Sequence, residues 1–184
     1  MQHKRELKSA RRGFSLGEFD LYYFDEAGFS LVPSVPYGWQ PTGERIEIPS
    51  GRSPQLNVLG FLRHDGKHFD SYVAQGSVDG SMVIACIDHF CSKLRKPTTV
   101  VIDNAPVHTS ALFQSMIPEW ESRNLFFWFL PPYCPELNLI EILWKKIKYQ
   151  WLPIDAYESL EKLNDRLCGV LTNIGKLFSI NFKI

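Results

Sequence analysis

Near the middle of the chain stands the stretch Thr98-Thr99-Val100-Val101-Ile102-Asp103-Asn104. Its β-branched residues form a run with no polar face beyond the two threonines, the pattern of a strand that is covered on both sides. Such a strand needs helices on both faces of its sheet, so the stretch predicts an α/β domain. It also places Asp103 at the carboxyl end of a strand.

The flanking segments extend this architecture. Further strands are predicted from aromatic or apolar runs bounded by Gly, Pro and Asp residues, at 19–24, 56–62, 68–74 and 125–130. Apolar residues at helical spacing predict helices at about 78–96, 109–123, 138–151 and 157–174. An Asp65-Gly66 turn joins the second and third runs as a hairpin. The expected fold is therefore a mixed five-stranded sheet flanked by helices.

Composition limits the organisation and the class of protein. With 184 residues, 45% of them hydrophobic, the chain can bury one sizeable core. We expect residues 1–18 to be a basic N-terminal tail, 19–152 to be the main domain, and 153–184 to be a C-terminal helix and tail packed on it. The basic tail could contact phosphates or simply be solvated.

Charge, hydropathy and cysteine usage exclude several classes. The chain has 20 basic and 20 acidic residues, so it lacks the positive excess of a self-sufficient DNA-binding protein. It has no apolar run long enough for a membrane span and no signal-peptide core, so we expect a cytoplasmic protein. Its four cysteines are scattered, which disfavours a disulfide framework or a structural zinc site.

Two acidic residues, Asp25 and Asp103, each directly follow an apolar strand. Active sites of open α/β sheets collect beyond the carboxyl ends of strands. A carboxylate close to a core is costly unless it is hydrogen-bonded or neutralised, and a divalent cation neutralises it well. Oxygen ligands with few histidines nearby favour magnesium or manganese over zinc. The alternative for either Asp is a turn or helix-cap residue.

A third carboxylate would complete a site for two metals, and Glu136 and Glu141 compete for this place. In the expected helix an apolar stripe is formed by Leu137, Ile140, Trp144, Ile147 and Trp151. Glu141 borders this stripe and would point along the edge of the core, whereas Glu136 precedes the helix. Asn138 to Glu141 also fits a capping box, so spacing alone leaves Glu141 open between cap and catalyst.

Three blocks of this sequence resemble the DDE transposases of the mariner superfamily, most closely their bacterial insertion-sequence branch. They are Asp25-Glu26-Ala27-Gly28, Asp103-Asn104-Ala105-Pro106-Val107-His108 and residues 130–144, which read LPPYCPELNLIEILW. Residues 37–43, YGWQPTG, also fit that branch. The resemblance implies a ribonuclease H-like fold. It places the family's catalytic and metal-binding triad on Asp25, Asp103 and Glu141, with 37 residues between the last two.

The resemblance implies the catalytic domain of a DNA transposase that cleaves transposon ends and transfers the strands into target DNA. Its cofactors would be two Mg²⁺ ions, with Mn²⁺ as an alternative, and it would work as a homodimer near the bacterial nucleoid. The family carries helix-turn-helix modules before this domain, and only about twenty residues precede the first strand here. We therefore expect a separate helix-turn-helix polypeptide as a partner, and no membrane.

Four further residues are candidates for DNA contacts: Asn104, His108, Lys145 and Lys148. Asn104 and His108 follow the second Asp and could position a phosphate, while the lysines follow Glu141 and could guide phosphates to the metals. Each also has a structural interpretation, as a turn residue, a buried packing residue or part of a solvated helix face.

Two rival functions remain open at this point. The first is a ribonuclease H-like nuclease that cleaves without strand transfer. The second is a catalytically inactive transposase remnant that binds DNA or full-length transposase through the preserved fold.

Overall fold

A five-stranded mixed sheet organises the chain in the computed structural model, which describes residues 2–34, 42–43, 54–132, 134–180 and 182. The sheet order is β3-β2-β1-β4-β5. The strands are β1 (Asp20–Phe29), β2 (Leu56–Arg63), β3 (Phe69–Gln75), β4 (Thr98–Ile102) and β5 (Leu125–Phe129). The pairs β1·β2 and β2·β3 are antiparallel, whereas β1·β4 and β4·β5 are parallel. The predicted mixed sheet is confirmed; of the YGWQPTG block, residues 37–41 lie outside the described residues.

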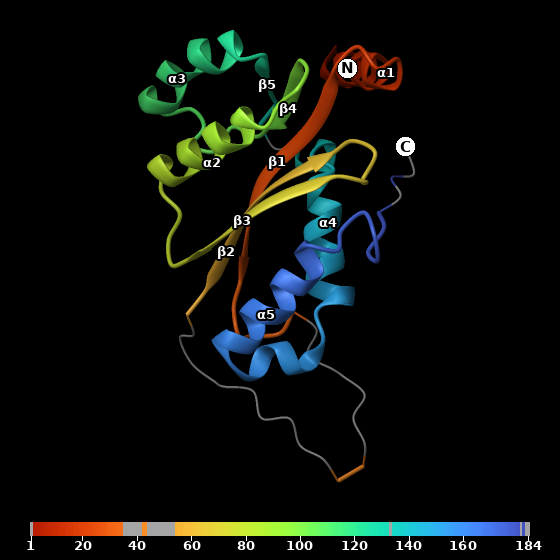
Figure 1. Ribbon diagram of the computed structural model, residues 1–184, viewed down its shortest axis with the longest axis vertical. Coiled ribbons are helices and arrows are strands. Elements are labelled where there is room, and N and C mark those ends of the chain that lie inside the picture. Colours follow the sequence, from red (N-terminus) through yellow and green to blue (C-terminus); the bar gives the residue numbers. More distant parts are fainter. Residues whose placement is uncertain (1, 35–41, 44–53, 133, 181, 183–184) are drawn as a thin grey trace.

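Helices cover both faces of this sheet (Figure 1). One face packs on α2 (Gly80–Ser92) and α3 (Ala111–Ser122), and the other on α4 (Ile140–Lys146) and α5 (Leu160–Leu171). Val100 and Ile102 of β4 are buried toward α2 and α3, while Val101 is buried in the opposite core. The β-branched stretch is therefore a strand covered on both sides, as its composition predicts.

The basic N-terminal segment differs from the tail that we expected. Gln2–Ser15 form helix α1, and Ala10 and Phe14, four residues apart on one helical face, pack against the α4/α5 core. Arg11 Nε donates a hydrogen bond to the Tyr23 hydroxyl at 3.4 Å. The apolar pair within a charged sequence gives the helix a face to bury, which is why it docks. None of the described helices is long and apolar enough to cross a membrane.

The helix expected over 138–151 is divided into two forms. Its α-helical part α4 is only Ile140–Lys146, and Ile147–Trp151 continue it as a π-helix, η2. Short 3-10 helices, η1 (Pro135–Leu137) and η3 (Ile154–Glu158), stand before α4 and before α5. After α5 the chain turns at Gly175, whose φ is +80° and whose α-carbon faces the Lys67 carbonyl in the β2–β3 hairpin. The chain after α5 therefore contacts the β2–β3 hairpin.

Candidate active site

Asp25 lies inside β1 and does not follow its end, because the strand runs on to Phe29 instead of ending at Phe24 as we expected. The continuation is held by antiparallel pairing with β2, which sets Asp25 opposite Gly60. On its other side β1 pairs with β4 only as far as Tyr23 and Val101. Asp25 and Asp103 each come two residues after this last pair, so they lie at the same height along the sheet. At this height β4 has ended and β1 continues.

Glu141 approaches these two residues from α4. The helix has no side-chain cap, and Asn138 does not make the capping-box bond. Instead Asn138, which is 4% exposed, donates from Nδ2 to the carbonyl of Phe24 at 3.1 Å. That bond ties the start of α4 to β1 beside Asp25, so the first turn of the helix presents Glu141 to the strand that carries Asp25.

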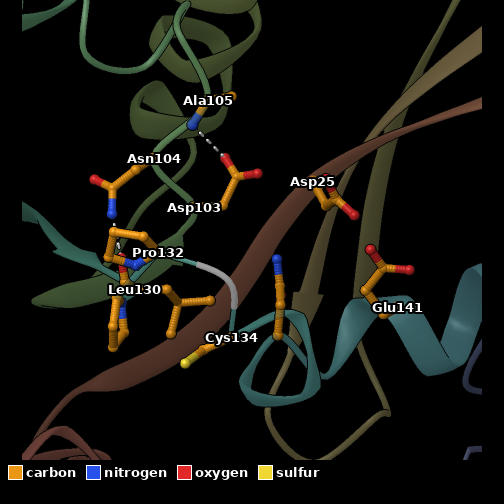
Figure 2. Close-up of a pocket in the computed structure, with 10 residues that line it drawn as sticks. Asp25, Asp103, Asn104, Ala105, Leu130, Pro132, Cys134 and Glu141 are labelled. Atoms are coloured by element: carbon orange, nitrogen blue, oxygen red, sulfur yellow. Dashed lines mark hydrogen bonds between the residues drawn. The ribbon is translucent and has the colours of Figure 1, made fainter.

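A cavity of about 410 Å³ collects the three carboxylates of Asp25, Asp103 and Glu141. Figure 2 shows Asp25 and Glu141 next to each other, with Asp103 facing them across the cavity. The other lining residues are Asn104, Ala105, Leu130, Pro131, Pro132, Cys134 and Asn138. No lysine or arginine is among the described lining residues, so no basic side chain there balances the three acids.

The Asp25 carboxylate is strongly perturbed. Burial and, to a smaller extent, the negative charges of Glu141 and Asp103 raise its pKa from 3.8 to about 7. A hydrogen bond from the Glu26 backbone and another from Trp144 Nε1 to Asp25 Oδ2, at 3.2 Å, lower the pKa only in part. The ionised form of Asp25 therefore lacks a positive partner, a condition that a bound divalent cation would relieve.

Asp103 is held in its ionised form. A hydrogen bond between His108 Nδ1 and Asp103 Oδ1, at 2.7 Å, lowers the Asp103 pKa and outweighs partial burial. The Ala105 backbone N–H donates to the same oxygen at 3.1 Å. His108 is 3% exposed and packs between the rings of Phe24 and Phe113, so it supports Asp103 from within the core.

Glu26 was not among the residues predicted from the sequence. It follows Asp25 in β1, so it points to the opposite face of the sheet, where its Oε1 lies 3.9 Å from His108 Nε2. Both atoms are buried without a hydrogen-bond partner among the described residues. Burial raises the Glu26 pKa. The alternation of a strand is the signal that could have assigned Glu26 to the His108 side.

The donor set of the cavity suits a hard divalent cation, since three carboxylates supply the oxygen ligands that Mg²⁺ and Mn²⁺ prefer. As the side chains stand, no three His, Cys, Asp or Glu residues of the described chain form a closed metal site. Asp103 lies across the cavity from the other two acids (Figure 2), and its Oδ1 is engaged by Ala105 and His108.

The remaining candidates divide between the cavity and the surface. Asn104 lines the cavity and donates from Nδ2 to the Leu130 carbonyl, which joins the ends of β4 and β5. Lys145 is exposed on α4, and the Lys148 ammonium lies over the Phe29 ring, 5.2 Å from its centroid. The structure therefore brings Asn104 to the acids, while neither lysine is among the residues that line the cavity.

Comparison with known proteins gives the family. Residues 20–164 match the model of the DDE superfamily endonuclease family, and this match spans the sheet, the cavity and the start of α5. The chain belongs to the DDE superfamily endonucleases. A search among curated proteins finds no sequence that matches this DDE endonuclease chain.

Solved structures share its fold at low sequence identity. The Mos1 transposase paired-end complex with left transposon end matches with a TM-score of 0.68 and 16% identity, over 95% of this chain and 54% of that one. The mariner Mos1 paired-end complex with Mg matches with a TM-score of 0.68 and 15% identity, over 96% and 54%. The catalytic domain of Mos1 mariner transposase matches with a TM-score of 0.60 and 13% identity, over 95% and 79%.

These matches confirm the ribonuclease H-like fold of the DDE endonuclease. The chain spans about half the length of the Mos1 chains in the two paired-end complexes.

Proposed function

We propose that this DDE endonuclease is the catalytic domain of a DNA transposase of the mariner superfamily, in its bacterial insertion-sequence branch. It would cleave transposon ends and transfer the strands into target DNA. The observation that carries the proposal is the cavity that presents Asp25, Asp103 and Glu141 without a balancing basic residue among the described lining side chains. The fold shared with Mos1 transposase complexes supports it.

The triad would hold two Mg²⁺ ions, or Mn²⁺, and when bound these ions activate the attacking oxygen and stabilise the leaving oxygen at phosphorus. Asp103 lines the same cavity as Asp25 and Glu141 and would be one of the three carboxylates that hold the ions. His108 and Ala105 fix its orientation through hydrogen bonds to Oδ1. Asp25 would have to be ionised to serve as a ligand, because metal ligation requires the carboxylate form.

Asn104, Lys145 and Lys148 are proposed to contact DNA. Asn104 reaches the cavity itself, where the scissile strand would lie, and the exposed Lys145 would contact backbone phosphates from α4. Lys148 would need to leave the Phe29 ring to do the same. We propose that His108, which is buried, acts through Asp103 and not through a phosphate.

We propose a homodimer for the active form, a separate helix-turn-helix polypeptide for recognition of transposon ends, and a cytoplasmic location at the nucleoid. We assign residues 19–152 to the catalytic domain, with 153–184 packed on it. Leu163, Leu167 and Val170 of α5 lie in the same core as α4, which supports this division.

The test is Mg²⁺-dependent cleavage of an intact transposon-end duplex, followed by joining of the freed 3′-hydroxyl to plasmid DNA. Glu141→Gln and Asp103→Ala should abolish both steps. Glu136→Gln is the matched control, because Glu136 is an exposed carboxylate of the same segment that does not line the cavity. Cleavage without joining would indicate a plain nuclease. DNA binding without cleavage, unaffected by Asp103→Ala, would indicate the inactive remnant.

A further inference from the structure

The indole of Trp144 is the side-chain donor that holds Asp25. Its Nε1 donates to Asp25 Oδ2 at 3.2 Å, and the ring is only 3% exposed. Trp144 lies three residues after Glu141, so both side chains leave α4 on the side that faces β1. One short helix therefore carries an acid of the cavity and the group that orients a second acid.

A glycine makes room for this indole. Gly60 is the register partner of Asp25 in β2 and lies on the same face of the sheet. A β-carbon at position 60 would stand 2.8 Å from Trp144 Cη2 and 2.7 Å from Phe69 Cε2, closer than such contacts occur. The backbone of β2 thus provides a slot for the far edge of the indole ring, directly opposite Asp25.

Two neighbouring aromatic side chains limit the position of the Trp144 indole in this slot. Phe29 and Phe69 meet Trp144 edge to face, with ring centroids 6.3 and 5.9 Å away and interplanar angles of 75° and 77°. An indole has one polar atom, and a buried N–H without an acceptor is costly. With the ring seated against Gly60, that N–H points at Asp25 Oδ2 and leaves the other carboxylate oxygen without this contact.

We infer that Trp144 is a positioning residue, seated by Gly60, that fixes the Asp25 carboxylate for binding of a divalent cation. The inference rests on the proposed function, since it concerns the same metal site. Groups that hydrogen-bond to metal ligands set the orientation of those ligands, and their loss typically weakens metal affinity by about 10- to 100-fold.

The test is Mn²⁺ binding to the intact 184-residue chain, followed by calorimetry or by the electron paramagnetic resonance signal of free Mn²⁺. Trp144→Phe keeps an aromatic ring and removes the donor, and it should raise the Mn²⁺ Kd by about tenfold or more. Trp120→Phe is the matched control: Trp120 is also fully buried and donates from Nε1 to an aspartate, Asp88 Oδ1 at 2.6 Å, but in the opposite core. It should leave the Mn²⁺ Kd unchanged.

Gly60→Ala tests the slot without touching the donor. It should weaken Mn²⁺ binding about as much as Trp144→Phe, because the new methyl group displaces the indole. In the double variant the two effects should not add, since both act through the same hydrogen bond. A methyl group at position 60 would also meet Phe69, so where Gly60→Ala does not fold, the comparison of Trp144→Phe with Trp120→Phe still decides the inference.

The outcomes separate the inference from the function on which it rests. If the wild type binds Mn²⁺, Asp103→Asn loses this binding and Trp144→Phe keeps it unchanged, the inference is overturned and the proposed metal site stands. Equal weakening by Trp120→Phe and Trp144→Phe would also overturn it, because a general loss of packing would then account for both. Wild-type binding that does not respond to Asp103→Asn would overturn the proposed function itself, and the inference with it.

Discussion

Replacing Asp25 by Asn should stabilise the protein in the absence of divalent cations. Burial and two neighbouring acids raise the pKa of Asp25 to about 7 in the folded chain, against 3.8 for an unperturbed aspartate. Between about pH 4 and pH 7, Asp25 is therefore protonated in the folded state and ionised in the unfolded state. The free energy of unfolding of the wild type falls as the pH rises through this window. Asn has the same shape and no proton to lose.

The magnitude follows from the pKa. Each pKa unit corresponds to about 1.4 kcal/mol, so the difference between 3.8 and about 7 sets an upper limit of about 4 kcal/mol above pH 7. Asp25 keeps some solvent contact and its neighbours can relax, so we expect about 2 kcal/mol. For a chain of this size that is a rise in Tm of about 4 to 8 °C.

The assay is thermal unfolding with EDTA between about pH 4 and pH 8, for wild type and Asp25→Asn. The two curves should meet near pH 4 and separate as the pH rises. Asp65→Asn is a control in which the change in stability should have the opposite sign. Burial raises the Asp65 pKa, but the hydrogen bonds from Arg63 and from the Lys67 backbone N–H lower it overall. That variant should lose stability at neutral pH and recover it relative to wild type in acid. A destabilised Asp25→Asn at pH 8, or a difference independent of pH, would refute the electrostatic account.

Three further predictions concern other parts of the chain. His108→Leu should raise the Asp103 pKa, because the ring hydrogen bond is the largest contribution to lowering it; NMR titration of aspartate carboxyl carbons checks this. Lys145→Ala should weaken DNA binding about equally for all sequences and reduce the slope of log K against log salt by about 1, measured by fluorescence anisotropy. Gly175→Ala should lower the free energy of unfolding by about 1 to 3 kcal/mol, measured by urea unfolding, because φ is +80° and the new methyl group would stand 2.3 Å from the Lys67 carbonyl oxygen. Gly169→Ala is the control: this glycine faces open space on α5, so the change should not destabilise the protein.

Local patterns were sufficient for the sheet and for Asp103 at the end of β4, whereas they left Glu141 open between a capping residue and a metal ligand. The β-branched run ending at Asp103 is a short-range signal, and the apolar stripe of α4 placed Glu141 at the edge of the core. The path of β1 was not predictable in the same way. Asp25 to Gly28 has the composition of a turn, but pairing with β2 over the whole length of the strand overrides that preference.

Contacts between distant segments explain what the sequence could not show. The burial of His108 depends on the rings of Phe24 and Phe113, which come from two other elements. Trp144 was recognised as a core residue, but its donor role requires knowing that Asp25 lies across the sheet. Gly60 did carry a signal, since a glycine inside an apolar strand often marks close approach of another group.

The bond from Asn138 to the Phe24 carbonyl has a consequence for how this architecture tolerates insertions and deletions. It joins the beginning of α4 directly to the strand that carries Asp25, so the relative position of Asp25 and Glu141 is set by this contact as well as by the residues that connect β5 to α4. A change in the length of that connection would first affect Pro131, Pro132 and Cys134, which line the cavity. Replacing Asn138 would remove the contact while every acid stays in the sequence, and α4 would then be held to the sheet by its core side chains alone.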